Sequence, residues 1–263
     1  MDPIDLGLNG ARAVVVGAGF LPHRAGFGRG TVLNLARAGA TVACIDISEQ
    51  RAKDIAQEVV DLGGKAFPIT ADARDSAGIK AAIDQAADQL GGLDVAVDIV
   101  GTAWWSRSAE QSDADFDSAI LTNLTQVFYT LKASVPHLIK NAPRQSAFVC
   151  LSSISSMGTS RYHAAYGAAK AGVSSLVRSF ADEYGKYGLR VNAVAPGAGT
   201  HAPIQDPKQS AKEISDGVLF LASSLASRIT GHTLPVDGGH VMAAVYNDSP
   251  EEQMLQNKPA SYE

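Results

Sequence analysis

Short apolar runs alternate with longer amphipathic stretches along almost the whole chain. The runs that predict strands occupy residues 13–16, 41–45, 66–69, 95–100, 148–151, 191–195 and 233–236. Between them, helical patterns are clearest over residues 31–39, 79–90, 116–139, 164–184 and 211–225. Apolar strands that alternate with helices are typical of a parallel sheet covered on both faces. The pattern therefore predicts an α/β fold with one Rossmann-type, doubly wound sheet of about seven strands.

A glycine-rich segment follows the first predicted strand. The strand leads into Gly17 and Gly19, and Gly26-Phe27-Gly28 then opens a helical pattern. Glycine lets the backbone turn sharply and approach a pyrophosphate closely, while free N–H groups in a helix's first turn bind the anion. Strand, glycine turn and helix start together predict a dinucleotide-binding site.

An acidic residue, Asp46, ends the second predicted strand. A carboxylate at this position would accept hydrogen bonds from the adenosine ribose hydroxyls and would repel a 2′-phosphate. NAD(H) is therefore favoured, although NADP(H) is not excluded. The alternative is an ordinary polar residue at a strand end, placed to cap the following helix.

Tyr166 and Lys170 are four residues apart, a spacing that puts both on one face of a helix. A phenol alone titrates near pH 10, so it needs a neighbouring positive charge to exchange protons at neutral pH. Ser153 follows the buried run at 148–151 and would emerge at the carboxyl edge of the sheet, where ligands bind. A chance tyrosine and lysine on a solvated helix face is the alternative for the pair.

Composition narrows the classes of partner and compartment. The 263 residues are 46% hydrophobic and carry a net charge of −5, which gives no basic surface for nucleic acid or anionic lipid. The two cysteines, Cys44 and Cys150, lie in apolar strands, which indicates buried thiols in a reducing compartment. No Cys/His spacing suggests a metal site. Without a signal-peptide pattern or a membrane span, we expect a cytoplasmic enzyme, with one domain over residues 1–241 and a tail over 242–263.

The motifs, in this order, resemble those of the short-chain dehydrogenase/reductase family, in the large subgroup with a Tyr-x-x-x-Lys active site. The resemblance covers nearly the whole sequence. It implies catalytic roles for Asn123, Ser153, Tyr166 and Lys170. It implies cofactor contacts for Gly17, Gly19, Gly26, Phe27, Gly28, Asp46, Ile47, Asp72, Ala73, Val100, Gly101, Tyr166, Lys170, Pro196 and Gly197.

The same resemblance implies a mechanism. Tyr166 would exchange a proton with the substrate oxygen, Ser153 would hydrogen-bond that oxygen, and a hydride would pass between nicotinamide and carbinol carbon. Lys170 would lower the pKa of the tyrosine and hold the nicotinamide ribose. Asn123 would hold a water that links Lys170 to solvent, unless it only satisfies a backbone group. Ser152 should point away from the site, because side chains alternate along a strand.

We therefore expect an NAD-dependent alcohol dehydrogenase or ketoreductase for a small secondary alcohol or ketone, lipophilic and cyclic. The alternatives are a dehydrogenase that turns a dihydrodiol into a catechol, or a cofactor-binding sensor without turnover. Trp104, Trp105 and His163 are candidate substrate contacts. The resemblance also implies a homotetramer that uses helices 116–139 and 164–184 and the last strand, with a dimer as the alternative.

Several segments depart from the family pattern. The glycines at 17 and 26 are unusually far apart, and Arg24 in the inserted segment 20–24 could reach a 2′-phosphate. Enoyl reductases also lengthen this loop, but their tyrosine and lysine are more widely spaced. Asp98 replaces an asparagine and, if buried, needs donors or a raised pKa. Only residues 198–210 stand where a long substrate lid is usual, so the pocket should be open or covered by the tail 242–263.

Overall fold

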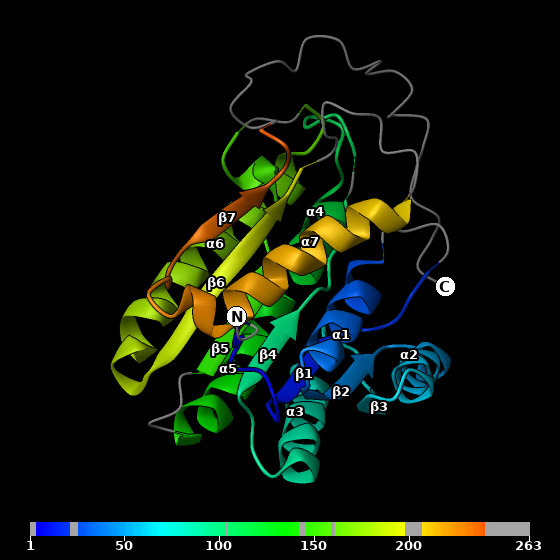
Figure 1. Ribbon diagram of the computed structural model, residues 1–263. Coiled ribbons are helices and arrows are strands. Elements are labelled where there is room, and N and C mark those ends of the chain that lie inside the picture. The colour runs from blue at the N-terminus through cyan, green and yellow to red at the C-terminus, as the bar shows by residue number, and fades with distance from the viewer. Residues whose placement is uncertain are drawn as a thin grey trace.

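The computed structural model describes residues 4–21, 26–103, 105–141, 146–158, 161–197 and 207–239. Its centre is a seven-stranded parallel sheet with the order β3-β2-β1-β4-β5-β6-β7 (Figure 1). The strands are β1 (Arg12–Val16), β2 (Thr41–Asp46), β3 (Lys65–Thr70), β4 (Val95–Asp98), β5 (Ser146–Leu151), β6 (Leu189–Pro196) and β7 (Thr233–Val236). The predicted doubly wound sheet is confirmed.

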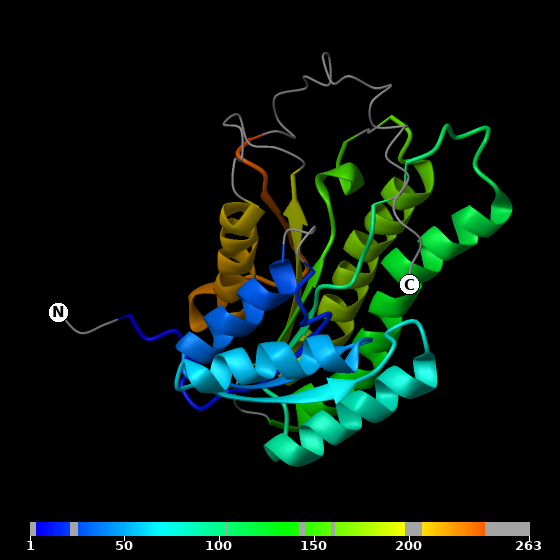
Figure 2. The ribbon, with the colours of Figure 1, turned by 90° about the vertical axis from the view of Figure 1, so that its right-hand side faces the viewer.

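Helices cover both faces of the sheet. They are α1 (Phe27–Arg37), α2 (Glu49–Asp61), α3 (Ser76–Leu90), α4 (Asp113–Ile120), α5 (Gln126–Leu138), α6 (Ala164–Tyr184) and α7 (Pro207–Ala222). Buried side chains of α1, α2 and α7 pack on one face, and those of α3, α5 and α6 pack on the other. Figure 2 shows the sheet between these two layers. Short helical turns are η1 (Leu121–Thr125), η2 (Ile139–Asn141), η3 (Ile154–Ser156), η4 (Gly185–Tyr187) and η5 (Ser224–Ala226).

The strand sequences fit their places in the sheet. Every residue of the central strands β4 and β5 is buried, which explains why both sequences are mainly apolar, apart from Asp98 and Ser146 at their ends, and do not alternate. Pro68, which cannot donate a backbone hydrogen bond, lies in β3 at the edge of the sheet and pairs in register with Cys44 of β2. Within the described part of the chain, no helix is long and apolar enough to cross a membrane.

The prediction of one continuous helix over residues 116–139 is wrong. The structure has α4, then the π-helical turn η1, then α5. Asn123 lies in η1, where its side-chain amide donates to the Ala119 carbonyl at 3.0 Å and its oxygen accepts from the Thr102 N–H at 2.9 Å. A polar side chain that bonds to the backbone inside a helix disturbs the regular ladder, and such turns are frequent at functional sites.

Two other predicted boundaries also shift. The fourth strand ends at Asp98 rather than at residue 100, because the Asp98 carboxylate accepts the Val100 N–H at 3.0 Å and turns the chain. Helix α7 begins at Pro207 rather than at residue 211, since proline suits the first position of a helix. The segment between Gly197 and α7 is thus even shorter than expected.

The strand order reverses between β1 and β4. The chain builds β1, β2 and β3 outward in one direction and then returns to place β4 on the other side of β1. Ligands of such sheets bind at this switch point, beyond the carboxyl ends of the strands. A side chain at Gly17, after β1, would be 3.0 Å from the Val100 side chain, after β4, so the ends of the two strands meet closely.

Candidate active site

The four residues predicted to be catalytic lie at the carboxyl edge of β4 and β5. Ser153 follows β5, Tyr166 and Lys170 are one turn apart on α6, and Asn123 lies in η1. The Lys170 Nζ lies 5.7 Å from the centre of the Tyr166 ring. A side chain at Gly101 would be 3.1 Å from that Nζ and 3.0 Å from the Asn123 oxygen. The glycine therefore leaves the space that these two groups use.

Ser153 and Tyr166 are joined through their side chains. The Ser153 oxygen already accepts the Ser155 N–H at 3.1 Å, so its own proton is available for donation. Burial raises the pKa of Tyr166 above its usual value, and the hydrogen bond with Ser153 opposes this rise. Burial of the phenol outweighs this hydrogen bond, and the lowering of the Tyr166 pKa by Lys170 stays a prediction. Tyr166 is therefore a protonated donor at neutral pH.

Lys170 is a buried cation. Only 2% of the residue is exposed, and Nζ donates to the Leu151 carbonyl at 2.8 Å. Burial lowers the pKa of Lys170 to about 8, and the negative charge of Asp98 opposes this fall. Most of the lysine therefore stays charged at neutral pH. Ser152 donates to the Lys170 carbonyl at 3.1 Å and so holds the same turn of α6, while its expected orientation away from the site stays a prediction.

Asn123 is fully buried and both ends of its amide bond to the backbone. This is the structural role that was the alternative for Asn123. Its part in a water relay stays a prediction.

Asp98 brings a second buried charge close to Lys170. Its exposure is 1%, and burial raises its pKa to about 6. Thr130, the Val100 N–H, the Lys170 charge and Gln126 oppose this rise, but Asp98 Oδ2 has no well-aligned hydrogen-bond partner among the described residues. Of the two consequences expected for a buried acid here, both occur in part: the Val100 N–H donates to the carboxylate, and burial raises the pKa.

The glycine turn forms a close backbone cradle. Gly17 and Gly26 have φ values of 78° and 74°, which are unfavourable for other residues. A Cβ at Gly28 would lie 2.0 Å from the Gly17 carbonyl oxygen, so no side chain fits there. Gly26 precedes α1 without a side-chain cap, which leaves first-turn N–H groups for an anion. These residues fit the pyrophosphate of a dinucleotide.

Asp46 lies at the end of β2 with one carboxylate oxygen toward the glycine turn. It accepts N–H groups from Gly19 and Ser48, each at 2.9 Å, and it forms an ion pair with Arg51 at 2.8 Å. The sequence analysis did not predict Arg51 as a partner of Asp46. Its position in the first turn of the helix that follows Asp46 could have indicated this ion pair. Ser48, and not Asp46, caps α2.

The other predicted cofactor residues line the same edge. Asp72 pairs with Arg74 at 2.7 Å, and this pairing lowers the pKa of Asp72. Ala73 is buried beside it, and Ile47 is exposed. Gly197 packs against the end of β7, where a Cβ would lie 2.5 Å from that of Asp237. Phe27 and Pro196 lie at the start of α1 and the end of β6.

The predicted substrate contacts are only partly described. Trp105 stacks on His163 with ring centres 3.4 Å apart, and His163 lies 4.9 Å from the Tyr166 ring. Trp104, residues 22–25 of the inserted segment, residues 198–206 and the tail from residue 240 lie outside the described residues.

Comparison with known proteins identifies the family. A family model described as enoyl-(acyl carrier protein) reductase matches residues 22–209. The cis-4-hydroxycyclohexanecarboxylate dehydrogenase of Sinomonas cyclohexanicum is 35% identical over 87% of this chain and 95% of its own length. The 2,5-dichloro-2,5-cyclohexadiene-1,4-diol dehydrogenase LinX of Sphingobium indicum is 32% identical over 81% of this chain and 91% of its own.

A solved structure agrees in fold. Carveol dehydrogenase from Mycobacterium avium in complex with NAD superposes with a TM-score of 0.77 at 29% identity, over 89% of this chain and 98% of that one. The chain belongs to the short-chain dehydrogenase/reductase family.

The buried acid generates a prediction about stability. The pKa of the Asp98 carboxyl is higher in the folded chain than its usual value of 3.8. Between about pH 4 and pH 6, the folded state therefore binds more protons than the unfolded state. The free energy of unfolding falls as the pH rises through this window. Asp98→Asn should remove this loss and stabilise the protein by up to about 3 kcal/mol near pH 8, with little gain near pH 4.

Urea unfolding of both proteins at the two pH values measures the effect. Asp98→Ala serves as the control, since it removes the hydrogen bond to Val100 at every pH. Equal stability of the wild type and the asparagine variant at the higher pH would show that Asp98 carries no penalty for ionisation.

Proposed function

We propose that this protein is an NAD(H)-dependent oxidoreductase that transfers a hydride between nicotinamide and a secondary alcohol or ketone. The observation that carries the proposal is the contact between the Ser153 and Tyr166 side chains, one helical turn from the buried Lys170 cation. Two hydroxyls that converge at the carboxyl edge of the sheet suit one substrate oxygen. The glycine cradle beside them suits the cofactor.

The residues divide the proton chemistry between them. Bound nicotinamide supplies the hydride acceptor or donor. In reduction, Tyr166 donates its proton to the substrate oxygen as negative charge develops there, and Ser153 donates a hydrogen bond to the same atom. In oxidation, Tyr166 must first lose its own proton before it can accept one from the substrate. The raised pKa of Tyr166 opposes formation of this phenolate, and the positive charge of Lys170 favours it.

A cyclic substrate is supported by the relatives and by the site. The names of two relatives specify six-membered ring compounds, and one is a diol dehydrogenase. Trp105 and His163 place flat rings next to Tyr166. The diol relative favours oxidation of a cyclic dihydrodiol as the second candidate reaction. The Ser153–Tyr166 contact supports carbonyl chemistry over the enoyl reduction that the family model's description names.

Tyr166→Phe tests the proposed acid. It should lower kcat by roughly a hundredfold or more because the proton donor is lost, while the dissociation constant of NADH should change little. Steady-state kinetics on cyclic ketones and NADH fluorescence titration measure the two quantities. Tyr187→Phe, on an exposed tyrosine of η4, is the matched control. Undiminished turnover in the Tyr166 variant would rule out its role.

We propose NAD(H) as the preferred cofactor because the buried Asp46 carboxylate lies beside the glycine turn and would repel a 2′-phosphate. Arg51 moderates this repulsion, since its guanidinium is paired with the same carboxylate. The balance of the two charges would then set how strongly NADP(H) is excluded. The competing determinant of cofactor choice is Arg24, which lies outside the residues that the structure describes.

Arg51→Gln tests this balance. Without its partner cation, Asp46 should repel the 2′-phosphate more strongly, so NADPH affinity should fall roughly tenfold more than NADH affinity. Fluorescence titration with each cofactor gives both constants. Lys53→Gln removes the same charge from an exposed position on α2 and is the control. If both variants shift the two affinities alike, Arg51 does not set cofactor choice.

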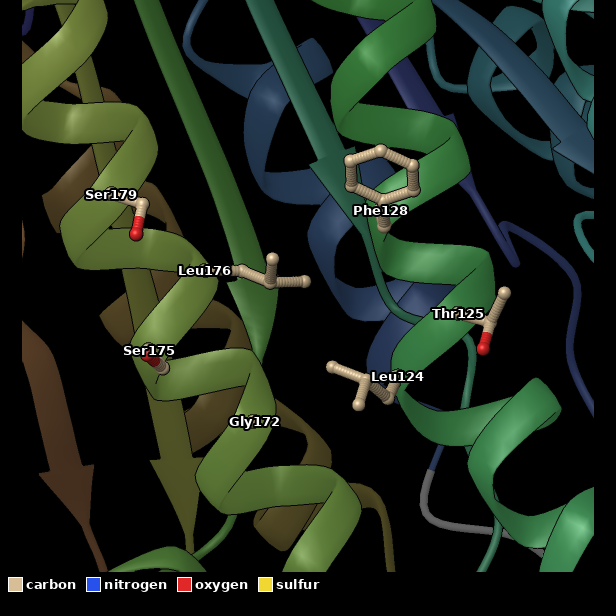
Figure 3. Close-up of a pocket in the computed structure, with 7 residues that line it drawn as sticks. All are labelled: Leu124, Thr125, Phe128, Gly172, Ser175, Leu176 and Ser179. Atoms are coloured by element: carbon tan, nitrogen blue, oxygen red, sulfur yellow. The ribbon is translucent and has the colours of Figure 1, made fainter.

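We propose a homo-oligomer, with a tetramer as the expected state and a dimer as the alternative, that uses the outer face of α5 and α6. A groove of about 420 Å³ lies there, lined by Leu124, Thr125, Phe128, Gly172, Ser175, Leu176 and Ser179 (Figure 3). Phe128 is 37% exposed on this face. Gly172 lets α6 pack closely against Leu124 of η1 at the floor of this groove, because a Cβ would lie 2.8 Å from the Leu124 side chain.

Phe128→Glu should weaken the assembly, because a charge would be buried in an apolar contact. Light scattering after gel filtration should give a larger mass for the wild type than for the variant. Val60→Glu, at an exposed apolar position on α2 across the sheet, should leave the mass of the assembly unchanged. A monomeric wild type would contradict the proposal.

A further inference from the structure

His163 is a buried histidine whose polar atoms are unsatisfied. Only 6% of the residue is exposed, and neither ring nitrogen has a hydrogen-bond partner among the described residues. An unpaired polar group in a protein interior costs free energy, so it calls for a physical reason. The neighbourhood of this ring supplies one.

The ring lies directly beside the proposed proton donor. It packs against both Trp105 and Tyr166 at tilted angles of 33° and 47°, with its centre 3.4 Å from the first ring and 4.9 Å from the second. His163 also occupies the position just before α6, so the helix that carries Tyr166 fixes its place. Because the two rings are neighbours, a substrate whose oxygen meets the Tyr166 hydroxyl would have the imidazole ring close to it.

The local backbone is arranged to hold this ring in place. Tyr162, the preceding residue, has a φ of 63°, a left-handed conformation that is unfavourable for a tyrosine. Its carbonyl accepts the Ser106 N–H at 2.9 Å, which ties the loop that carries Trp105 to the loop that carries His163. Strained residues of this kind cluster at ligand sites, where surrounding contacts maintain them.

The chemistry of the ring selects a partner. Burial lowers the pKa of His163 to about 4, so the imidazole is neutral at physiological pH. A neutral imidazole has one N–H donor and one acceptor nitrogen. A hydroxyl group complements either nitrogen, because it can accept from the first or donate to the second. A carboxylate lacks the proton for the acceptor nitrogen and gains no ion pair from a neutral ring.

We propose that His163 binds a second hydroxyl group of the substrate, one or two carbons from the reacting carbon. The preferred substrates are then cyclic diols and the corresponding hydroxyketones, rather than simple ring alcohols. This inference rests on the proposed function and specifies its substrate class. It makes His163 a specificity-determining residue, while the proton and hydride steps stay at Tyr166 and the nicotinamide.

A size-matched pair of substrates tests the proposal. The vicinal diol of cyclohexane is compared with the cyclohexanol that carries a methyl group in place of the second hydroxyl, both assayed with NAD in the oxidation direction. The methyl group leaves His163 unpaired, so kcat/KM should favour the diol by roughly tenfold to a hundredfold in the wild type. The diol with one more carbon between its hydroxyls extends the comparison.

Variants then assign the preference to the imidazole. His163→Phe keeps a flat ring for the stack with Trp105 but cannot hydrogen-bond, so the diol preference should collapse to near unity. His163→Asn restores a donor and an acceptor and should recover part of the preference. His232→Phe changes an exposed histidine just before β7, at the opposite edge of the sheet, and should leave the ratio unchanged.

The outcomes are distinct. If the wild-type protein turned over the diol and the methyl-substituted alcohol with equal kcat/KM, the role of His163 would be overturned. The same holds if His163→Phe lowered kcat/KM equally for the two substrates. Either result would leave the proposed function standing. Absence of turnover with any ring alcohol or ketone, despite NADH binding, would overturn the proposed function and the inference with it.

Discussion

The site depends on a cation held in the interior at the carboxyl edge of the sheet. Lys170 is almost fully buried, and its ammonium donates to the last carbonyl of β5. Taking a charge out of water is costly unless the surroundings compensate it. Here the compensation comes from that carbonyl and from the negative potential of Asp98 on the neighbouring strand, which raises the pKa of the lysine against burial. Gly101 leaves the space for the ammonium.

Burial also determines the protonation of the neighbouring groups. It keeps the phenol of Tyr166 protonated and the imidazole of His163 neutral, so these two side chains offer donors and one acceptor without a net charge from either ring. Groups of this kind suit an uncharged alcohol or ketone better than an anion. Farther along the same edge of the sheet, the carboxylate of Asp46 and the guanidinium of Arg51 lie beside the glycine turn, where we propose that the adenosine of the cofactor binds. The proposal thus places specificity for cofactor and for substrate at separate ends of the site.

The sequence predicted the seven-strand sheet and its order of elements because buried parallel strands and amphipathic helices leave clear patterns. It also placed Ser153, Tyr166 and Lys170 together, since strand ends and helical spacing fix their relative positions. It missed the π-helical turn at Asn123, which arises from long-range bonding to Thr102 that no local period reveals. The pairing of Asp46 with Arg51 and the raised pKa of Tyr166 also escaped, because ion pairs and desolvation depend on packing between distant segments.

Direct hydride transfer is the central claim, and isotope labelling tests it most directly. A cyclic secondary alcohol with deuterium on its carbinol carbon is incubated with NAD and the wild-type protein, and the reduced cofactor is analysed by mass spectrometry. The account predicts one deuterium in the NADH and none in the solvent, because the hydride passes straight from carbon to nicotinamide while Tyr166 handles only the proton. Unlabelled NADH, or bound cofactor that is never reduced, would contradict it.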